Sequence, residues 1–156
     1  MSKVYIVGIV ASGKTTFAKK LSIEANIPFY ELDCVVYVKT NNGRYKRTPE
    51  EQMEELRRID DLGDWIIEGT YRESCKCLLD MSDEIIFLDP PLWLRKYRIL
   101  KRFIKQQLHL EACHYKSNLT MLKMMYKWTN DFERNRAQFE SMLEKYECKL
   151  TKITKR

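Results

Sequence analysis

A glycine-rich segment near the start of the chain, residues 8–16, constrains the fold more than any other feature. Its sequence, GIVASGKTT, fits the pattern G-x-x-x-x-G-K-[ST]. A short β-branched and aromatic run, residues 4–7, precedes the segment, and residues 13–25 carry apolar side chains at helical spacing. A strand, a tight loop and a helix in this order are the context in which the pattern binds nucleotide phosphates.

Each residue type in this segment suits the binding of phosphates for a chemical reason. Its glycines let the backbone wind tightly, so that several N–H groups converge on one phosphate at the positive end of a helix. Lys14 adds a mobile positive charge for the outer phosphates, and the Thr15 hydroxyl is suited to Mg²⁺. The sequence therefore predicts a nucleoside triphosphate site formed by Gly8, Ala11, Ser12, Gly13, Lys14, Thr15 and Thr16.

Strand-like and helical segments alternate along the rest of the chain. Strands are predicted at residues 29–32, ending at Asp33, at 65–67, ending at Glu68, at 84–89, and more weakly at 149–154. Helices are predicted from Thr48 to about residue 62, through residues 78–79, over 92–107, and onward to 148 with a break at Asn130. This order predicts one α/β domain, residues 1–156, in which a parallel sheet of about five strands is covered on both faces.

Composition limits where the protein works and what it binds. No run approaches 18 apolar residues, which predicts no membrane contact. The five cysteines are odd in number and irregularly spaced, which predicts reduced thiols and a cytoplasmic protein. The net charge is +6, but it is segregated. Residues 39–47 carry four bases and no acid, and residues 95–105 carry six bases and no acid. Such clusters attract nucleic acid or the phosphates of a small ligand.

The basic segment 95–105 belongs to the predicted helix 92–107. Arg95, Arg98, Arg102 and Lys105 are spaced to form one stripe. The apolar residues on another face are expected to pack on the sheet: Leu92, Ile99, Leu100, Phe103 and Ile104. A second set of large apolar residues, between positions 121 and 142, is expected to fill the core.

The chain resembles small P-loop kinases of the adenylate kinase and shikimate kinase type over nearly its whole length. Three segments carry the resemblance: LD at 32–33, IIEGTYR at 66–72, and IFLD at 86–89 before an arginine-rich helix. The second of them is similar to the Asp-Gly-Phe-Pro-Arg turn of adenylate kinases. Glu replaces Asp and Thr-Tyr replaces Phe-Pro in that turn. Within this type, the chain most resembles a bacterial group labelled "DNA topology modulation protein". That resemblance is carried by LD at 32–33, TPEE at 48–51, WIIEGTY at 65–71 and FLD at 87–89. A GTPase is disfavoured because Asn-Lys-x-Asp is absent.

The resemblance implies a three-layer, nucleoside-monophosphate-kinase-like fold and transfer of the ATP γ-phosphate to a small acceptor, a nucleotide or a small hydroxylated metabolite. Catalysis would involve Lys14, Asp33, Arg98 and Arg102, and the acceptor would meet Asp33, Glu68, Gly69 and Arg72. Thr15 with Glu68 or Asp89 would hold Mg²⁺, directly or through water. Residues 34–63 would bind the acceptor, where Arg44, Lys46 and Arg47 hint at an anionic one, and residues 105–118 would form a short lid.

An alternative from another class is a nucleotide-dependent DNA-binding or DNA-topology-modulating regulatory protein. The basic segments and the label of the bacterial group favour it. The absence of a recognisable reading helix or aromatic stacking platform disfavours it. The sequence indicates neither the acceptor nor an oligomeric state.

Overall fold

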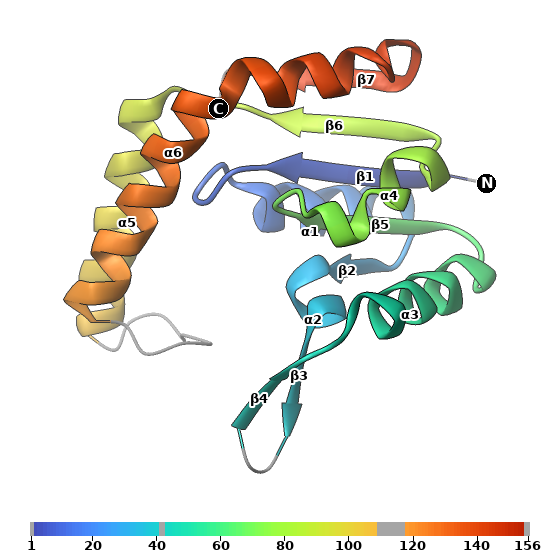
Figure 1. Ribbon diagram of the computed structural model, residues 1–156, viewed down its shortest axis with the longest axis horizontal. Coiled ribbons are helices and arrows are strands. Elements are labelled where there is room, and N and C mark those ends of the chain that lie inside the picture. The colour runs from blue at the N-terminus through green and yellow to red at the C-terminus, as the bar shows by residue number, and fades with distance from the viewer. Residues whose placement is uncertain (1, 41–42, 109–117, 155–156) are drawn as a thin grey trace.

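The computed structural model describes residues 2–40, 43–108 and 118–154 (Figure 1). Its strands are β1 (Lys3–Gly8), β2 (Phe29–Glu31), β3 (Tyr37–Thr40), β4 (Gly43–Lys46), β5 (Trp65–Gly69), β6 (Glu84–Leu88) and β7 (Leu150–Ile153). Its α-helices are α1 (Lys14–Ala25), α2 (Leu32–Val36), α3 (Pro49–Asp61), α4 (Cys77–Met81), α5 (Leu92–Gln107) and α6 (Leu119–Glu144). Two short 3₁₀ turns, Glu73–Cys75 and Glu147–Lys149, complete the order.

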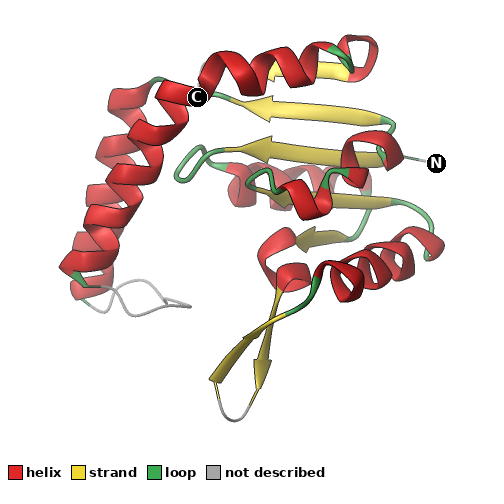
Figure 2. Ribbon diagram, viewed as in Figure 1, coloured by secondary structure: helices red, strands yellow, loops and turns green. Residues whose placement is uncertain are grey.

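Five strands form one parallel sheet in the order β2-β5-β1-β6-β7 (Figure 2). The predicted parallel sheet of five strands is confirmed, including the weak last strand, which pairs with β6. β1 is central, and the chain crosses from one side of it to the other between β5 and β6. Ligands of open α/β sheets bind outside the carboxyl ends of such strands, where β1 leads into the glycine-rich loop.

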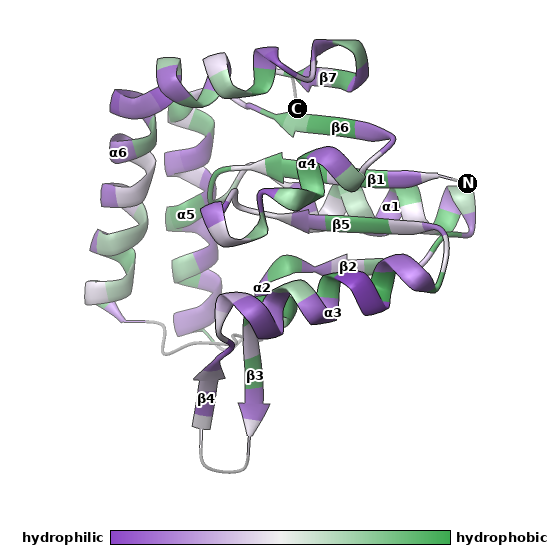
Figure 3. Cartoon of the chain, turned by 45° about the vertical axis from the view of Figure 1, so that its right-hand side comes forward, coloured by the Kyte–Doolittle hydropathy of each residue, from purple (hydrophilic) through white to green (hydrophobic). Residues whose placement is uncertain are grey.

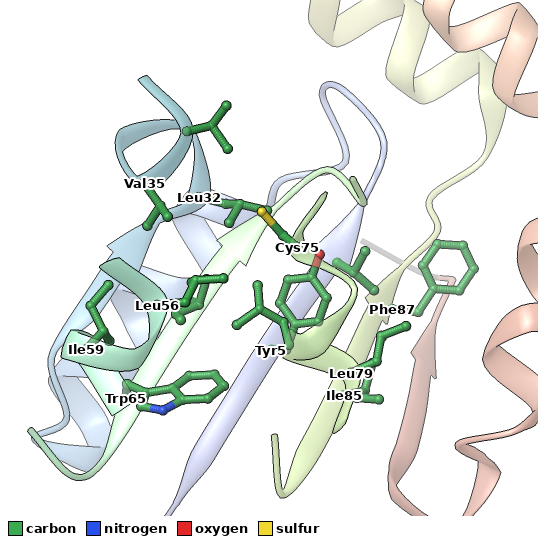
Figure 4. Close-up of a cluster of buried hydrophobic side chains, with 14 of the residues drawn as sticks. Tyr5, Leu32, Val35, Leu56, Ile59, Trp65, Cys75, Leu79, Ile85 and Phe87 are labelled. Carbon is green, nitrogen blue, oxygen red and sulfur yellow. The ribbon is translucent and has the colours of Figure 1, made fainter. Parts of the chain in front are cut away.

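Alternate residues of the strands bury two separate apolar faces, because successive side chains of a strand point to opposite sides. Val4, Ile6, Ile66 and Ile86 pack with Ala18 of α1 on one face. On the other face lie α2, α3, α4 and the later part of α6, whose side chains join the large cluster of Figure 4. Figure 3 shows the hydrophobic strands between α1 on one face and α3 and α4 on the other. The three-layer arrangement is therefore confirmed.

The segment between β2 and α3 differs from the sequence-based expectation. Leu32 and Asp33 do not end the second strand, because they form the first turn of α2. The polar stretch that follows is an antiparallel hairpin, β3–β4, which projects from the sheet (Figure 1). The helix start at Thr48 is confirmed: its hydroxyl accepts a bond from the N–H of Glu51, and the Glu51 carboxylate accepts one from the N–H of Thr48.

Helix α6 runs without interruption from residue 119 to 144, so the predicted break at Asn130 is wrong. The Thr129 hydroxyl donates to the carbonyl of Met125, four residues earlier, a bond that often bends a helix while leaving its backbone ladder intact. Figure 1 shows the ribbon of α6 changing direction. Its earlier part lies beside α5, and its later part places Phe132 and Phe139 against Phe87 of β6.

The expectation that α5 packs its apolar face on the sheet is wrong, because its main contacts are with α6. Ile99 is buried, but Leu100 is 43% and Ile104 49% exposed. Helix α5 lies against α6 beyond the end of the sheet, so only one side of it is covered (Figures 1 and 3). Met124 and Trp128 of α6 are also exposed, whereas Met125 is buried. Within the described residues, no helix combines the length and apolar character needed to cross a membrane.

Candidate functional site

The loop between β1 and α1 has the backbone of an anion-binding nest. Ala11 has φ 59° and Gly13 has φ 96°, so two nearby residues take the left-handed conformation. Left-handed residues in such a loop turn successive N–H groups toward one point. The Nζ of Lys14 donates to the carbonyl of Ile9 at 3.0 Å and so lies folded back along the loop. The buried Ser12 Oγ has no hydrogen-bond partner among the described residues.

The first turn of α1 is joined to the end of β5 by a side-chain hydrogen bond. The Thr15 hydroxyl donates to Oε1 of Glu68 at 2.6 Å, and Glu68 is only 5% exposed. Burial raises the pKa of the Glu68 carboxyl, an effect that the nearby Lys14 charge and the Thr15 hydroxyl oppose. Burial lowers the pKa of Lys14, opposed by the charges of Glu68 and Asp33. A hydroxyl, a carboxylate and an ammonium group therefore meet beside the loop.

Gly69 brings α2 close to this cluster. A Cβ at position 69 would lie 2.4 Å from the Cβ of Leu32, so only glycine allows α2 to start against the end of β5. Asp33 follows Leu32, and its Oδ1 accepts a bond of 2.7 Å from Nη2 of Arg72, just beyond β5. Asp33 and Arg72 thus face each other near Glu68, on which the charge of Asp33 acts.

The β3–β4 hairpin adds an aromatic side chain to this site that the sequence analysis did not identify. The guanidinium of Arg44 lies 4.0 Å from the ring centroid of Tyr37, and that of Arg72 lies 5.7 Å from it. Arg47 points elsewhere, since its Nη1 donates to the carbonyls of Cys34 and Val35 at the end of α2. No motif marks Tyr37; only the pairing of β3 with β4 places it between two arginines.

The basic residues of α5 do not form one common face toward a ligand. Arg98 reaches the glycine-rich loop, where its Nη1 donates to the carbonyls of Ala11 and Ser12 at 3.3 and 3.1 Å. Arg102 is close enough to lower the pKa of Lys14 through its charge. Arg95 is fully buried and pairs with Glu133 of α6 and with the carbonyl of Pro90. Arg98 and Arg102 thus lie near the loop, whereas Arg95 joins two helices.

Asp89, at the end of β6, lies in a different set of contacts from Glu68. Its Oδ2 pairs with Arg136 at 2.6 Å and with Lys152 at 3.4 Å, and no described residue bonds its Oδ1. Arg136 also contacts Glu133 and Glu140 of α6. The Asp89 carboxylate therefore links α6 and β7 to β6.

Residues 109–117, which make up most of the predicted lid, lie outside the described residues.

Within the described ranges, no group of three or more His, Cys, Asp or Glu side chains could hold a metal ion by itself. A cation at the loop would therefore depend on the pair Thr15 and Glu68 together with oxygens of its ligand. This is the arrangement expected where a metal enters with nucleotide phosphates and keeps part of its water.

A five-stranded parallel sheet, helices on both faces and a glycine-rich loop after the central strand define a P-loop nucleotide-binding fold. No protein-family model matches the chain, and no curated protein matches it. Solved structures do match.

An uncharacterized protein from Eubacterium ventriosum is 19% identical over 86% of this chain and 76% of its own, with a TM-score of 0.54. Shikimate kinase from Bacteroides thetaiotaomicron is 13% identical over 88% of this chain and 82% of its own, with a TM-score of 0.50. Deoxyadenosine kinase from M. mycoides, solved with bound dATP, is 14% identical over 98% and 90%, also with a TM-score of 0.50. The chain therefore has the fold of the small P-loop kinases.

Proposed function

We propose that the protein is an ATP-dependent phosphotransferase that moves the γ-phosphate of ATP to a small acceptor. One observation carries the proposal: the Thr15–Glu68 pair at the glycine-rich loop lies beside the Asp33–Arg72 pair. The first pair suits the phosphate side of a kinase site and the second suits the acceptor side. Gly69 holds the two pairs together, because it lets α2 pack at the end of β5.

On the nucleotide side, the loop amides and the start of α1 would cradle the β-phosphate. Lys14 would leave the carbonyl of Ile9 and turn its ammonium group to the β- and γ-phosphates. The unpartnered Ser12 Oγ is free to bond a phosphate oxygen. Gly8 and Thr16 flank this cradle at the end of β1 and in the first turn of α1.

Thr15 and Glu68 would hold the Mg²⁺ that accompanies ATP. Both offer oxygen, the ligand that Mg²⁺ prefers, and the buried Glu68 has an unfavourable charge that a cation would stabilise. The metal would supply positive charge beside the transferring phosphate. We assign this role to Thr15 and Glu68 rather than Asp89, because Arg136 and Lys152 already pair with Asp89.

On the acceptor side, Asp33 would orient the acceptor hydroxyl and accept its proton, since it lies close enough to influence Lys14 electrostatically. Arg72 would bind an anionic group of the acceptor. Its buried Nε has no partner among the described residues, so it retains a donor for such a group. Tyr37, flanked by Arg44 and Arg72, would contact a flat or apolar part of the same molecule. A nucleotide or a phosphorylated or carboxylated metabolite fits this chemistry.

Arg98 and Arg102 would stabilise the charge of the transferring phosphoryl group. Arg98 already contacts the loop, so a change of side-chain rotamer would bring its guanidinium to the phosphates. Catalysis would then consist mainly of positioning and electrostatic stabilisation, as phosphoryl transfer requires.

The test is Mg²⁺-dependent consumption of ATP with a panel of nucleosides, nucleoside monophosphates and small hydroxylated metabolites. We expect acceptor-dependent release of ADP that Lys14→Ala lowers by about 10³-fold or more. Lys20→Ala, an exposed lysine on the same helix, serves as the matched control and should leave the rate unchanged. ATP binding without turnover on any acceptor of the panel would contradict the proposal.

A further inference from the structure

Helix α5 carries a row of large apolar side chains on the side that points away from α6. Because 3.6 residues make one turn, residues spaced by three or four positions share a face. Four such residues of α5, and Leu108 directly after its end, follow one another at this spacing, and we call them the α5 ridge: Trp93, Tyr97, Leu100, Ile104 and Leu108, which are 69, 56, 43, 49 and 61% exposed. The helix is about 24 Å long, and the ridge extends along nearly all of it.

The inner side of α5 already has its partner. Arg95 and Ile99 are buried, and Arg95 pairs with Glu133 of α6. Tyr126 of α6 also donates to the carbonyl of Lys96. The ridge is therefore a second apolar face on a helix whose first face is satisfied, and its exposed fractions indicate that no described residue covers it. Scattered exposed apolar residues need no explanation, but a continuous row of five does.

Charge restricts what could cover the ridge. Helix α5 contains six Lys and Arg residues and no Asp or Glu. At 100° per residue, Lys96 borders one side of the ridge and Lys101 and Lys105 border the other. The Nζ of Lys101 lies 5.9 Å from the ring centroid of Tyr97, so the positive charge directly adjoins the apolar row. The complement of this surface is apolar at its centre and negative around it.

A second copy of the chain does not provide that complement. Pairing of two ridges would bring the lysines of one α5 against those of the other, which is unfavourable. The acidic helix α3 offers a single exposed large apolar residue, Leu62 at its end. On α6, the exposed Met124 and Trp128 each follow an exposed lysine, so that face is basic too. The remaining exposed large apolar residues of the described chain lie on separate elements: Ile23, Tyr45 and Leu119.

We infer that the α5 ridge, contrary to the sequence-based expectation of no membrane contact, is a docking site for an anionic lipid bilayer surface. A helix with Trp and aliphatic residues on one face and Lys or Arg beside them is the type that lies in the plane of a membrane interface. Trp and Tyr rings favour the headgroup level, and long lysine stems let the ammonium groups reach lipid phosphates. A convex single-helix ridge also matches a deformable surface better than a protein, which would need a groove bordered by acids. This inference is independent of the phosphotransferase proposal.

The experiment measures co-sedimentation of the full chain with vesicles. Phosphatidylcholine vesicles containing about one-third phosphatidylserine are compared with pure phosphatidylcholine, at about 0.1 M salt and at about 0.5 M salt. We expect binding to the anionic vesicles only, weakened by salt. The double variant Leu100→Asn/Ile104→Asn should reduce the partition coefficient by about tenfold or more, because two apolar side chains no longer enter the interface. Lys101→Gln/Lys105→Gln should reduce it by about 30-fold.

Matched controls separate the ridge from general effects. Ile23→Asn/Leu62→Asn removes two apolar residues that are at least as exposed on α1 and at the end of α3, and Lys20→Gln/Lys76→Gln removes the same charge elsewhere. Both controls should bind vesicles like the parent chain, and circular dichroism should show all variants folded. Absence of binding to anionic vesicles would overturn the inference. Equal loss in ridge and control variants would do so too, because binding would then follow net charge alone.

Two other results would also overturn it. If the chain ignores vesicles but binds an acidic amphipathic peptide in a manner that Leu100→Asn/Ile104→Asn abolishes, the ridge is a protein-docking face. If sedimentation equilibrium shows a dimer that the same variant dissociates, the ridge is an interface between copies.

Discussion

The proposed nucleotide side and the proposed acceptor side of the site are built in different ways. The nucleotide side consists largely of backbone, in a loop with two left-handed residues and the start of α1, to which Lys14, Thr15 and the buried Glu68 add side chains. The acceptor side consists of side chains on a short helix and a projecting hairpin, and its Asp33 side chain is 61% exposed. Backbone cannot be changed by ordinary substitution, whereas exposed side chains can. The contrast predicts a fixed nucleotide site beside an adaptable acceptor site.

The largest effect should follow a change on the nucleotide side. Thr15→Val keeps the shape of the side chain but removes the hydroxyl that donates to Glu68. We expect the turnover rate to fall by about 10²-fold or more and the free energy of unfolding to fall by about 1–2 kcal/mol, because a buried carboxylate loses its donor. Steady-state kinetics and urea denaturation measure the two effects. Thr120→Val, in the exposed first turn of α6, is the control; equal losses in both variants would refute the role of Thr15.

A second change tests the junction between the two sides. Gly69→Ala would place a Cβ 2.4 Å from the Cβ of Leu32, so α2 must move away from β5. We expect a loss of about 3 kcal/mol in unfolding free energy, together with weaker acceptor binding as Asp33 shifts. Gly43→Ala, with no described atom within 4 Å of the added Cβ, should lose only about 1 kcal/mol through its left-handed φ of 127°. Similar losses in the two variants would show that α2 is not tightly held.

The third change separates the sides functionally. Arg72→Gln removes the charge that pairs with Asp33 on the acceptor side. We expect the KM for an anionic acceptor to rise by about 30-fold while the KM for ATP stays unchanged. Initial rates at varied acceptor and varied ATP distinguish these effects. Arg57→Gln on the exposed face of α3 is the control. If Arg72→Gln raised the KM for ATP alone, the assignment of Arg72 to the acceptor side would be wrong.

The smallest effect concerns pH. Burial raises the pKa of Glu68 in the folded chain, so the folded state holds this proton more tightly than the unfolded state does. The free energy of unfolding should therefore fall as pH rises from the ordinary glutamate range through the raised pKa. Glu68→Gln should remove this part of the slope, and Glu54→Gln, on the exposed face of α3, should not. Urea denaturation from about pH 4 to about pH 8 measures it; identical slopes in the parent chain and Glu68→Gln would contradict the assignment.

Local sequence patterns predicted most of the fold. The loop pattern, the capping box at Thr48 and the apolar runs of the strands each depend on neighbours a few residues away, and all were confirmed. The errors arose where distant contacts decide. A capping pattern at Asn130 did not end α6, because both parts of that helix find partners, one in α5 and one on β6.

The candidate site shows the same difference between what local patterns predict and what distant contacts decide. Sequence and family resemblance together predicted Lys14, Thr15, Glu68, Asp33 and Arg72 as site residues, and the structure brings them together. The sequence did not identify Tyr37, because no local pattern indicates which ring a hairpin will place between two arginines. It also expected Leu100 and Ile104 to be covered, because the spacing of apolar residues on a helix does not distinguish a face buried in the core from one left exposed.

The sequence by itself determined the phosphate-binding loop and the parallel sheet that carries it, because backbone geometry and strand burial follow from residue types close together in the chain. Only the tertiary structure decided which side chain each acid contacts. Glu68 lies beside Thr15, 53 positions away, while Asp89 pairs with Arg136, 47 positions away. Both acids lie at the end of a strand at the same edge of the sheet, and their different contacts come from the elements that pack next to each: α1 beside Glu68, and α6 and β7 beside Asp89.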